Sequence, residues 1–396
     1  MSLQIDQIRE MMPGVLDTTY LNTGTCGPLP KIAYDAMVQE LANDLTGARI
    51  SSAHFERLFE LWGETRDEVA AVLRTEASNI AITNRTTDGM YVALMGYPWQ
   101  ERDELIITNI EHPGGLLPSF LARQRFNVRV KVADVKLGGE SVEETVAAFE
   151  KLITPRTRMI ALSHVPYTTG ARLPVKEIVE MAHSHDVLVT VDAAQSYGAF
   201  DNDVHDLGVD FFACPGQKWM CGPDGTGALY VRPEALGELN QNFAGMFEWT
   251  SLDYHGRSYQ PAANASRFDT GGWNLGLLAG QVAATRWIRE EVGLDWAYER
   301  IERLNSGAYD ALAEMDGVEM VTPRDNKSGL IAFTFDGIEP VELSERLAED
   351  DNVTIRYVTK YINNPDAARV SIGFYNNEED IEKLMTGLEK VRATLD

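Results

Sequence analysis

The chain has few cysteines, few lysines and no long apolar run. Its three cysteines, Cys26, Cys214 and Cys221, are odd in number and contain no C-x-x-C pair, so they form neither a disulfide framework nor a zinc set. No apolar stretch approaches the ~20 residues of a membrane-spanning helix. The first residues, from Met1, lack the basic and apolar segments of a signal peptide. We therefore expect a cytoplasmic protein with reduced thiols and no membrane contact.

Positive charge is scarce. The 396 residues include 10 lysines and 25 arginines against 60 acidic residues, which gives a net charge of −25. This negative charge repels polyanions and argues against nucleic acid or an anionic membrane as a partner. Hydrophobic residues make up 44% and charged residues 24% of the chain, as in ordinary globular proteins.

Strand-like and helix-like segments alternate along the first part of the chain. Several of the strand-like runs are apolar on both faces, as parallel strands between helix layers are. This pattern predicts a doubly wound α/β domain with a mostly parallel seven-stranded sheet over about residues 21–255. The seven predicted strands are Ile80–Thr83, Glu104–Thr108, Arg129–Val132, Met159–Ser163, Leu188–Val191, Phe211–Ala213 and Ala228–Val231, and the predicted helices include Ile32–Leu45, Phe55–Leu73, Val142–Leu152 and Val175–His183.

The pattern changes after about residue 256. A glycine-rich loop, Phe268–Trp273, precedes a long helix predicted over Leu275–Val292. Helices and strands then mix, which predicts a smaller α+β domain over residues 256–396. We expect residues 1–20 to pack on this second domain. Its predicted elements are the helices Asp295–Met315, Pro340–Glu349 and Asn377–Thr394 and the strands Leu330–Phe335, Val353–Arg356 and Arg369–Ile372.

Polar side chains follow several of the predicted strands, where an α/β sheet binds its ligands. Thr86 and Thr87 precede a helix after the first strand, and either an anion site or a plain helix cap explains them. His112 follows the second strand, and a lone histidine is usually packed or exposed. Asp192 and Gln195 follow the strand Leu188–Val191. Each motif is weak alone, but their order along one sheet is specific.

Lys218 lies between an apolar strand and the glycine-rich turn Gly222–Gly227. Burial there would lower the pKa of the amine and make it a usable nucleophile. Pyridoxal phosphate needs such a lysine, an anion site for its phosphate, a flat group to stack on its ring, a carboxylate for its pyridine nitrogen and a donor for its phenolate oxygen. The sequence supplies all five in order and predicts a pyridoxal-phosphate site.

Two patterns resemble a metal site and a dinucleotide-binding motif, but we expect both to have structural roles only. His183 and His185 have no third metal ligand in view, so we expect a helix end and no metal site. The glycines of Gly222–Gly227 follow the lysine and precede a final strand, so they are not a dinucleotide-binding motif.

The motifs together resemble the class V aminotransferase family of fold-type I pyridoxal-phosphate enzymes, which includes cysteine desulfurases, isopenicillin N epimerase and cystine C–S lyase. The similarity runs from Tyr20–Gly24 to Arg369–Asn376. Its most specific pieces are Val191–Ser196 and Gln217–Trp219. The resemblance implies a pyridoxal 5'-phosphate cofactor, a small amino-acid substrate and a homodimer.

The resemblance also implies a role for each matching residue. Lys218, Asp192 and His112 would be catalytic, as the Schiff-base lysine, the partner of the pyridinium nitrogen and the stacking imidazole. Gln195 would donate to the phenolate oxygen, and Thr86, Thr87 and Gln217 would contact the phosphate, with Gln217 in place of the family's usual histidine. Arg369 would bind the substrate carboxylate, and Arg356 matches a second arginine of the cystine lyase branch.

Departures from the family pattern bear on the reaction. The loop Tyr357–Ala368 contains no cysteine, although desulfurases carry their persulfide cysteine there. Gly272 stands where relatives often supply a threonine to the neighbouring subunit's phosphate. Cys26 lies in a loop that in relatives approaches the substrate.

We therefore expect a pyridoxal-phosphate-dependent lyase that acts through a Cα carbanion by β-elimination at a C–S bond. The alternatives are a class V aminotransferase or an isopenicillin N epimerase-like epimerase, and a cofactor-free binding protein that only keeps the fold. The residues expected to line the substrate side-chain pocket are His54, Tyr167, Phe247 and Trp249.

Overall fold

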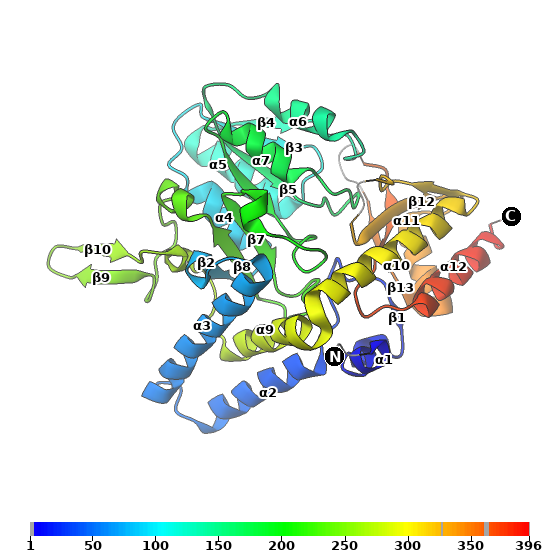
Figure 1. The fold of residues 1–396 in the computed structure, drawn as a ribbon, viewed down its shortest axis with the longest axis horizontal. Helices are drawn as coiled ribbons and strands as arrows, with labels where there is room; N and C mark the ends of the chain where they lie inside the picture. Colours follow the sequence, from blue (N-terminus) through cyan, green and yellow to red (C-terminus); the bar gives the residue numbers. More distant parts are fainter. Residues whose placement is uncertain (1–3, 326–327, 360–363, 396) are drawn as a thin grey trace.

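A seven-stranded sheet forms the centre of the computed structural model, which describes residues 4–325, 328–359 and 364–395 (Figure 1). The strand order is β2-β8-β7-β6-β5-β3-β4, and β8 alone runs antiparallel to its neighbours in this sheet. The predicted doubly wound, mostly parallel sheet is confirmed. The strands are β2 (Ile80–Thr83), β3 (Glu104–Thr108), β4 (Arg129–Ala133), β5 (Thr157–Ser163), β6 (Leu188–Asp192), β7 (Phe211–Pro215) and β8 (Gly227–Val231).

Alternate residues of each central strand face two separate cores. On β7, Phe212 and Cys214 join a core that includes residues of α3, α6 and α7, whereas Phe211 and Ala213 join one built on α4. Burial on both faces explains why these strands read as continuous apolar runs. The helices of this part are α2 (Lys31–Thr46), α3 (Ser52–Leu73), α4 (Thr86–Gly96), α5 (Pro113–Phe126), α6 (Val142–Glu150), α7 (Val175–His183) and α8 (Val204–Leu207).

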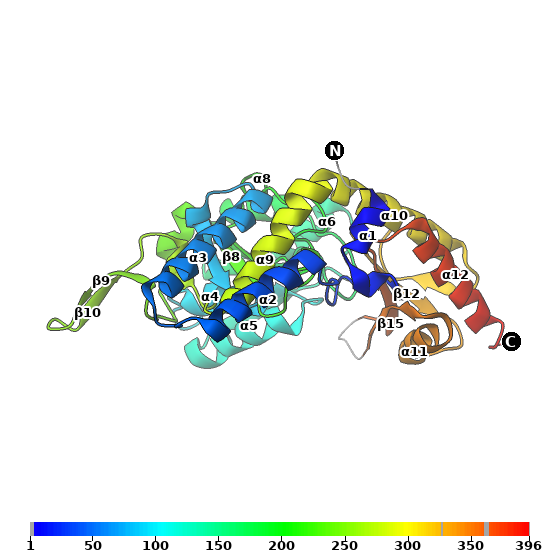
Figure 2. The ribbon, with the colours of Figure 1, turned by 90° about the horizontal axis from the view of Figure 1, so that it is seen from below.

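Helix α5 and the strands β9 and β10 are among the elements that were not predicted from the sequence. Helix α5 contains Pro113 and Pro118 and two glycines, which hide its helical pattern, and its first proline occupies a position where no helical hydrogen bond is lost. The strands β9 (Trp249–Asp253) and β10 (Ser258–Pro261) form a hairpin that projects from the molecule (Figures 1 and 2). The predicted boundary near residue 255 falls in the turn of this hairpin, and the position of the boundary stays a prediction.

The C-terminal part begins with two helices in series. Helix α9 (Leu275–Trp287) contacts α2 and α3, and a π-helical turn at Ile288–Gly293 joins it to α10 (Leu294–Glu314). A four-stranded antiparallel sheet of order β11-β12-β15-β14 follows. Its strands are β11 (Val318–Met320), β12 (Leu330–Phe335), β14 (Arg356–Val358) and β15 (Ala367–Ser371), and its helices are α11 (Pro340–Asp351) and α12 (Glu378–Arg392).

The N-terminal segment lies against this C-terminal part. Strand β1 (Thr19–Tyr20) pairs in parallel with β13 (Val353–Thr354). Arg9 of α1 (Ile5–Glu10) donates to the Asp380 carboxylate of α12 over 2.8 Å. The chain after β1 then runs back towards the large sheet, which brings residues 22–27 to the carboxyl ends of its strands.

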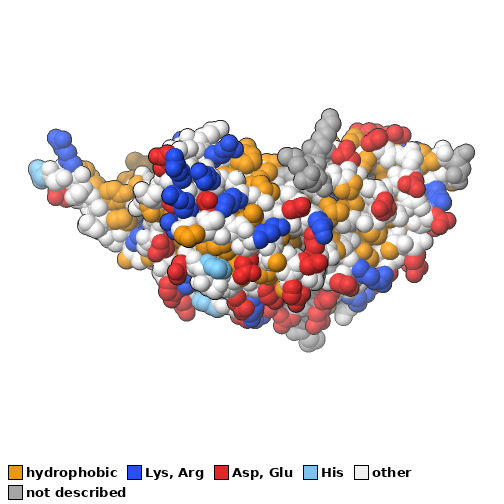
Figure 3. Space-filling model, turned by 90° about the horizontal axis from the view of Figure 1, so that it is seen from above, with side chains coloured by type: hydrophobic (Ala, Val, Ile, Leu, Met, Phe, Trp, Pro, Cys, Tyr) orange, Lys and Arg blue, Asp and Glu red, His pale blue; other side chains and the backbone are white. Residues whose placement is uncertain are grey.

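Charge is distributed unevenly over the surface. Figure 3 shows acidic side chains across much of one face and a group of Lys and Arg side chains towards the end that carries the hairpin. Within residues 4–325, 328–359 and 364–395, no helix has the length and apolar character needed to cross a bilayer.

The close packing of α4 on the sheet depends on Gly89. A Cβ atom at this position would lie 2.7 Å from the Ala213 Cβ on β7, whereas a Cβ at Gly63 in α3 would meet nothing within 4 Å. We expect Gly89→Ala to lower the free energy of unfolding by about 1–3 kcal/mol, because α4 must move off the sheet. Gly63→Ala is the matched control and should raise it by up to ~1 kcal/mol through helix propensity. Urea unfolding of the two variants measures the difference, and equal stability would contradict the packing argument.

Candidate active site

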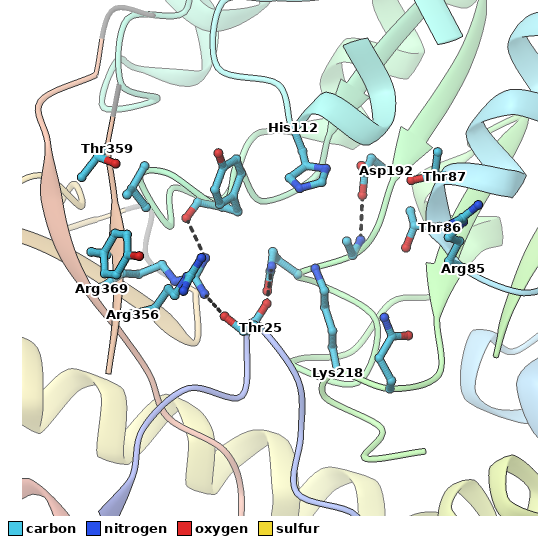
Figure 4. A pocket seen from close by; sticks show the side chains of 17 residues that line it. Thr25, Arg85, Thr86, Thr87, His112, Asp192, Lys218, Arg356, Thr359 and Arg369 are labelled. Carbon is cyan, nitrogen blue, oxygen red and sulfur yellow. Dashed lines mark hydrogen bonds between the residues drawn. The ribbon is translucent and has the colours of Figure 1, made fainter. Parts of the chain in front are cut away.

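A cavity of about 420 Å³ lies at the carboxyl ends of the parallel strands (Figure 4). The cavity is lined by all nine residues to which the family resemblance gives a cofactor or carboxylate role: Thr86, Thr87, His112, Asp192, Gln195, Gln217, Lys218, Arg356 and Arg369. Sequence reasoning expected Tyr167 as well and missed the other lining residues, among them Thr25, Arg85, Tyr357 and Thr359. The structure thus brings together residues that lie up to 345 positions apart in the chain, from Gly24 to Arg369.

One end of the cavity is a helix N-terminus. Thr86 and Thr87 are the first two residues of α4, after the N-cap residue Arg85. The backbone N–H groups of a first helical turn have no partner inside the helix, and together with hydroxyls they form an anion site. Gln217 lines the cavity with them, and its buried Oε1 has no hydrogen-bond partner in the described structure.

Asp192 is the last residue of β6 and is 4% exposed. Its Oδ1 accepts a hydrogen bond of 2.9 Å from the Ala194 N–H, which orients the carboxylate at the strand end. The negative charge acts on two other residues of the site, because it raises the pKa of both His112 and Lys218 against the effect of their burial.

The Lys218 amine makes no hydrogen bond or ion pair with any described residue. Burial lowers its pKa to about 8, Asp192 opposes this shift and the Arg369 charge reinforces it. A lysine in this state loses its proton near neutral pH and can act as a nucleophile or a base. In Figure 4 the amine points into the cavity, with Thr86 and Thr87 on one side and the two arginines on the other.

His112 is the N-cap of α5, and its ring is fixed by that role. Nδ1 accepts a hydrogen bond of 2.9 Å from the Gly114 N–H, so a neutral ring carries its proton on Nε2. Burial lowers the pKa of the imidazole, and the ring is therefore a flat, uncharged surface in the cavity. Tyr167 lies edge-on to it, with ring centroids 4.9 Å apart.

Gln195 connects the site to the N-terminal loop. Its Nε2 donates to the Gly24 carbonyl over 2.8 Å, and its Oε1 accepts from Trp219 Nε1 over 3.1 Å. These bonds fix which side of the amide carries the donors and leave one N–H for another acceptor. The loop can approach this closely because Gly27 has no side chain. A Cβ atom at this position would lie only 2.1 Å from the Lys218 carbonyl oxygen.

Two arginines form the other end of the cavity. Arg369 on β15 is 3% exposed, and its guanidinium donates to the Tyr167 carbonyl over 3.3 Å and to Thr25 Oγ1 over 2.9 Å. Its buried Nε has no partner, and no described carboxylate pairs with it. Arg356 lies directly opposite on β14. Burial and the Arg356 charge lower the pKa of Arg369 to about 10, so this end attracts anions.

Three of the residues expected around a substrate side chain lie elsewhere in this chain. His54 Nδ1 lies 3.3 Å from an Asp44 carboxylate oxygen, Phe247 stacks on Trp273, and Trp249 belongs to the projecting hairpin. Only Tyr167 of the four lines the cavity of the described chain. Periodicity and motifs carry no signal that would separate it from the other three.

Cys26 and His183, which the sequence analysis also considered, make contacts outside the cavity lining. Cys26 Sγ donates to the Gln217 carbonyl over 3.4 Å and is not among the lining residues, and burial raises the pKa of its thiol. His183 ends α7 and binds Asp210, with 3.0 Å between Nε2 and Oδ2. The described part of the chain contains no group of His, Cys, Asp and Glu side chains that could hold a metal ion.

Gly272 has a left-handed backbone, with φ of +93°. Its carbonyl accepts a hydrogen bond from Trp62 Nε1, and a Cβ at this position would lie 2.7 Å from that nitrogen. The tight contact explains the glycine here, whereas a threonine side chain would collide with Trp62.

Comparisons with known proteins agree with this geometry. The family model Aminotransferase class-V matches residues 19–384. A probable cysteine desulfurase from Methanothermobacter thermautotrophicus is 26% identical over 98% of this chain and 98% of its own length. A cysteine desulfurase from Haloferax volcanii is 27% identical over 95% of this chain and 90% of its own.

Solved structures share the fold. The complex of the cystine C–S lyase C-DES with its reaction product cysteine persulfide has a TM-score of 0.88 and 27% identity, and covers 95% of this chain and 98% of C-DES. A lysine variant of C-DES, with glycine covalently linked to its pyridoxal-phosphate cofactor, has a TM-score of 0.89 at the same identity, over 96% of this chain and 98% of C-DES. The fold-type I architecture is confirmed. Because the family model covers nearly the whole chain, this protein belongs to the class V aminotransferase family.

Proposed function

We propose that this protein is a pyridoxal-phosphate-dependent enzyme that cleaves the C–S bond of a cysteine-derived amino acid. The observation that carries the proposal is that Lys218 and Arg369 line the same cavity. The Lys218 amine has no partner in the described structure, and the buried Arg369 guanidinium has no carboxylate partner there. A buried unpaired charge is costly, and a substrate carboxylate would compensate it.

The donor set of the cavity fits the cofactor. The α4 N-terminus with the hydroxyls of Thr86 and Thr87 and the side-chain N–H groups of Gln217 would hold the phosphate, and Asp192 would hold the pyridine nitrogen in its protonated form. The free N–H of Gln195 would donate to the phenolate oxygen. The neutral His112 ring would stack on the cofactor, and the Lys218 amine would attach to it covalently.

When bound, pyridoxal phosphate supplies a conjugated ring that takes up the electron pair released at the substrate Cα. Arg369 binds the substrate carboxylate with its remaining donors and so fixes which bonds of Cα face Lys218. The Lys218 amine, neutral above about pH 8, removes the Cα proton. Loss of the sulfur group from Cβ, with its bonding electron pair, would leave an unsaturated amino acid, and hydrolysis of this product by one water molecule would give pyruvate and ammonia.

The composition of the segment before Arg369 favours a reaction in which sulfur leaves with the substrate fragment and is not transferred to a cysteine of the protein. Tyr357–Ala368 contains no cysteine that could accept sulfur, and Tyr357, Val358 and Thr359 of this loop line the cavity. Residues 360–363 of the loop lie outside the described residues. Cys26 does not line the cavity, so the sulfur-accepting thiol of a desulfurase has no counterpart there among the described residues.

The two arginines favour a substrate with two carboxylates. Arg356 and Arg369 are direct cross-strand neighbours and both line the cavity. Cystine carries two α-carboxylates, one on each half, whereas cysteine carries one. Cystine is therefore the preferred substrate, with Arg369 on the reacting half and Arg356 on the other.

A homodimer is part of the proposal. The solvent face of α2 carries four apolar side chains at helical spacing, Tyr34, Val38, Leu41 and Leu45, and each is more than 40% exposed. Such a stripe on a soluble protein is typical of an interface.

Light scattering after gel filtration tests the dimer and should give twice the chain mass. The double variant Leu41→Lys, Leu45→Lys should give the mass of one chain, because the added charges would disrupt the apolar interface. A monomeric native protein would reject the dimer.

Incubation of the purified protein with L-cystine and pyridoxal phosphate tests the reaction. We expect a yellow protein that releases pyruvate, and we expect Lys218→Ala to lower turnover by about 10³-fold because the amine that moves the Cα proton is gone. Quantitative assay of pyruvate and of persulfide sulfur measures both products. Formation of a keto acid that retains sulfur, or Cα–H exchange without loss of sulfur, would show transamination or epimerisation instead.

Arg356 and Arg369 should differ in their effects on substrates. We expect Arg356→Gln to raise the KM for cystine by about 10- to 100-fold, the value of one charged hydrogen bond, with little change in kcat. The same variant should affect cysteine much less. Arg369→Gln, the matched control on the facing strand, should impair both substrates. An equal effect of Arg356→Gln on cystine and cysteine would contradict the assignment of the second carboxylate.

A further inference from the structure

A second buried carboxyl group lies beside the site and takes no part in the mechanism above. Glu111 lies in the loop after β3, directly before His112, and is 3% exposed. Its Oε1 accepts a hydrogen bond of 2.5 Å from Thr108 Oγ1, and its Oε2 accepts one of 2.6 Å from Ser163 Oγ. These hydroxyls come from β3 and β5, so the carboxyl group is held between two strand ends.

Strand register brings Glu111 close to Asp192. Ser163, the last residue of β5, is the register partner of Asp192, the last residue of β6. The carboxyl group bound to Ser163 therefore lies behind the carboxylate that faces the cavity. Burial raises the pKa of Glu111 to about 7, the hydroxyls of Ser163 and Thr108 oppose this, and the Asp192 charge adds to it.

Two hydroxyl groups and two imidazole rings lie near Glu111 in the chain or in space. Thr108 and Ser163 present hydroxyls, and the neighbours of Glu111 and Ser163 along the chain are His112 and His164. Burial lowers the pKa of both imidazoles, to about 3 for His164, so neither ring is a cation at neutral pH. The Asp192 charge reaches Glu111 and raises its pKa further.

We propose that Glu111 and Asp192 form a proton-linked pair, in which a cationic ring bound at Asp192 drives a proton off Glu111. The inference rests on the proposed function. A pyridinium nitrogen would cancel the field of Asp192 and so make the ionised form of Glu111 less costly. The O–H bond of Glu111 breaks, its electrons stay on the carboxylate oxygen and the proton passes to solvent. Glu111 would then be a positioning residue that acts on the cofactor through Asp192.

Thermodynamic linkage makes the effect reciprocal. If the bound ring favours ionised Glu111, then ionised Glu111 favours the bound ring by the same factor. The affinity of the full-length apoprotein for pyridoxal phosphate should therefore gain a component that rises with pH as Glu111 ionises. This component is separate from the titration of Lys218 and of the cofactor itself.

Calorimetric titration of the full-length apoprotein with pyridoxal phosphate tests the proposal. Runs in buffers of different ionisation enthalpy give the number of protons released per chain. We expect the native protein to release more protons than Glu111→Gln, by up to about half a proton near pH 7, because a group near its pKa is half protonated. The difference should vanish by about pH 9. Contributions of Lys218 and the cofactor are common to both proteins and cancel in the difference.

Glu104→Gln is the matched control. Glu104 is the first residue of β3, is 4% exposed and accepts hydrogen bonds from the hydroxyls of Thr154 and Thr157. It lies at the opposite end of the strand, where it pairs with Lys131. This variant should release the same number of protons as the native protein, so an effect confined to Glu111→Gln cannot come from the mere loss of a buried carboxyl group.

A second readout needs no cofactor. An acid whose folded pKa is raised holds its proton in the folded state and loses it on unfolding, so stability falls as pH rises between its unfolded and folded pKa values. The Tm of the apoprotein should therefore fall between about pH 4.5 and 7 through Glu111, and Glu111→Gln should remove that part of the slope.

The possible results separate the two proposals. Equal proton release by the native protein and Glu111→Gln, with cofactor bound by both, overturns the proton-linked pair. Failure of the native protein to bind pyridoxal phosphate overturns the proposed function instead. Should Glu111→Gln not fold, Ser163→Ala replaces it. Loss of that donor favours protonated Glu111, so the pH range of proton release should shift upward, and an unchanged range would reject the pair.

Discussion

The cavity of this strongly acidic protein contains two basic side chains that have no carboxylate partner, and the proposed chemistry depends on this arrangement. Lys218 and Arg369 lie at the same cavity, and neither pairs with a carboxylate among the described residues. Asp192 acts on Lys218 and His112, but it does not pair with Arg369. The 60 acidic residues could supply counterions easily, yet no described carboxylate pairs with Arg369 or Lys218. The site is built to receive anions from outside.

Different parts of the chain maintain that arrangement. The large sheet places Asp192 and Lys218 at the ends of the adjacent strands β6 and β7, whereas Arg356 and Arg369 come from the small sheet. The N-terminal loop joins the two, because Gln195 binds the Gly24 carbonyl and Arg369 binds Thr25. A substrate held by Arg369 and attacked near Lys218 would therefore bridge both sheets. Movement of either sheet would change the alignment of the reacting bonds.

The sequence predicted which strand-end residues lie in this cavity better than it predicted the other residues that line it. Asp192, Lys218 and Thr86 could be found because strand ends meet at one edge of a sheet, a rule that needs no side-chain detail. Thr25 could not, since it reaches the cavity through the N-terminal loop and contacts Arg369, 344 residues away. Tyr357 could not either, since its position depends on the pairing of β14 with β15. The prolines and glycines of α5 hid a helix that tertiary packing stabilises. The projecting hairpin gave no signal beyond short polar-apolar runs.

The resemblance to desulfurases does not decide the fate of sulfur, and the local chemistry does. A persulfide relay needs a thiolate that can reach the leaving sulfur, and thiolate formation needs an environment that lowers the thiol pKa. Burial instead raises the pKa of Cys26, and the nearby Asp224 carboxylate raises it further. Burial also raises the pKa of Cys214 and Cys221. The raised thiol pKa values therefore support the proposed lyase reaction, in which the leaving sulfur would depart on the substrate's own second half.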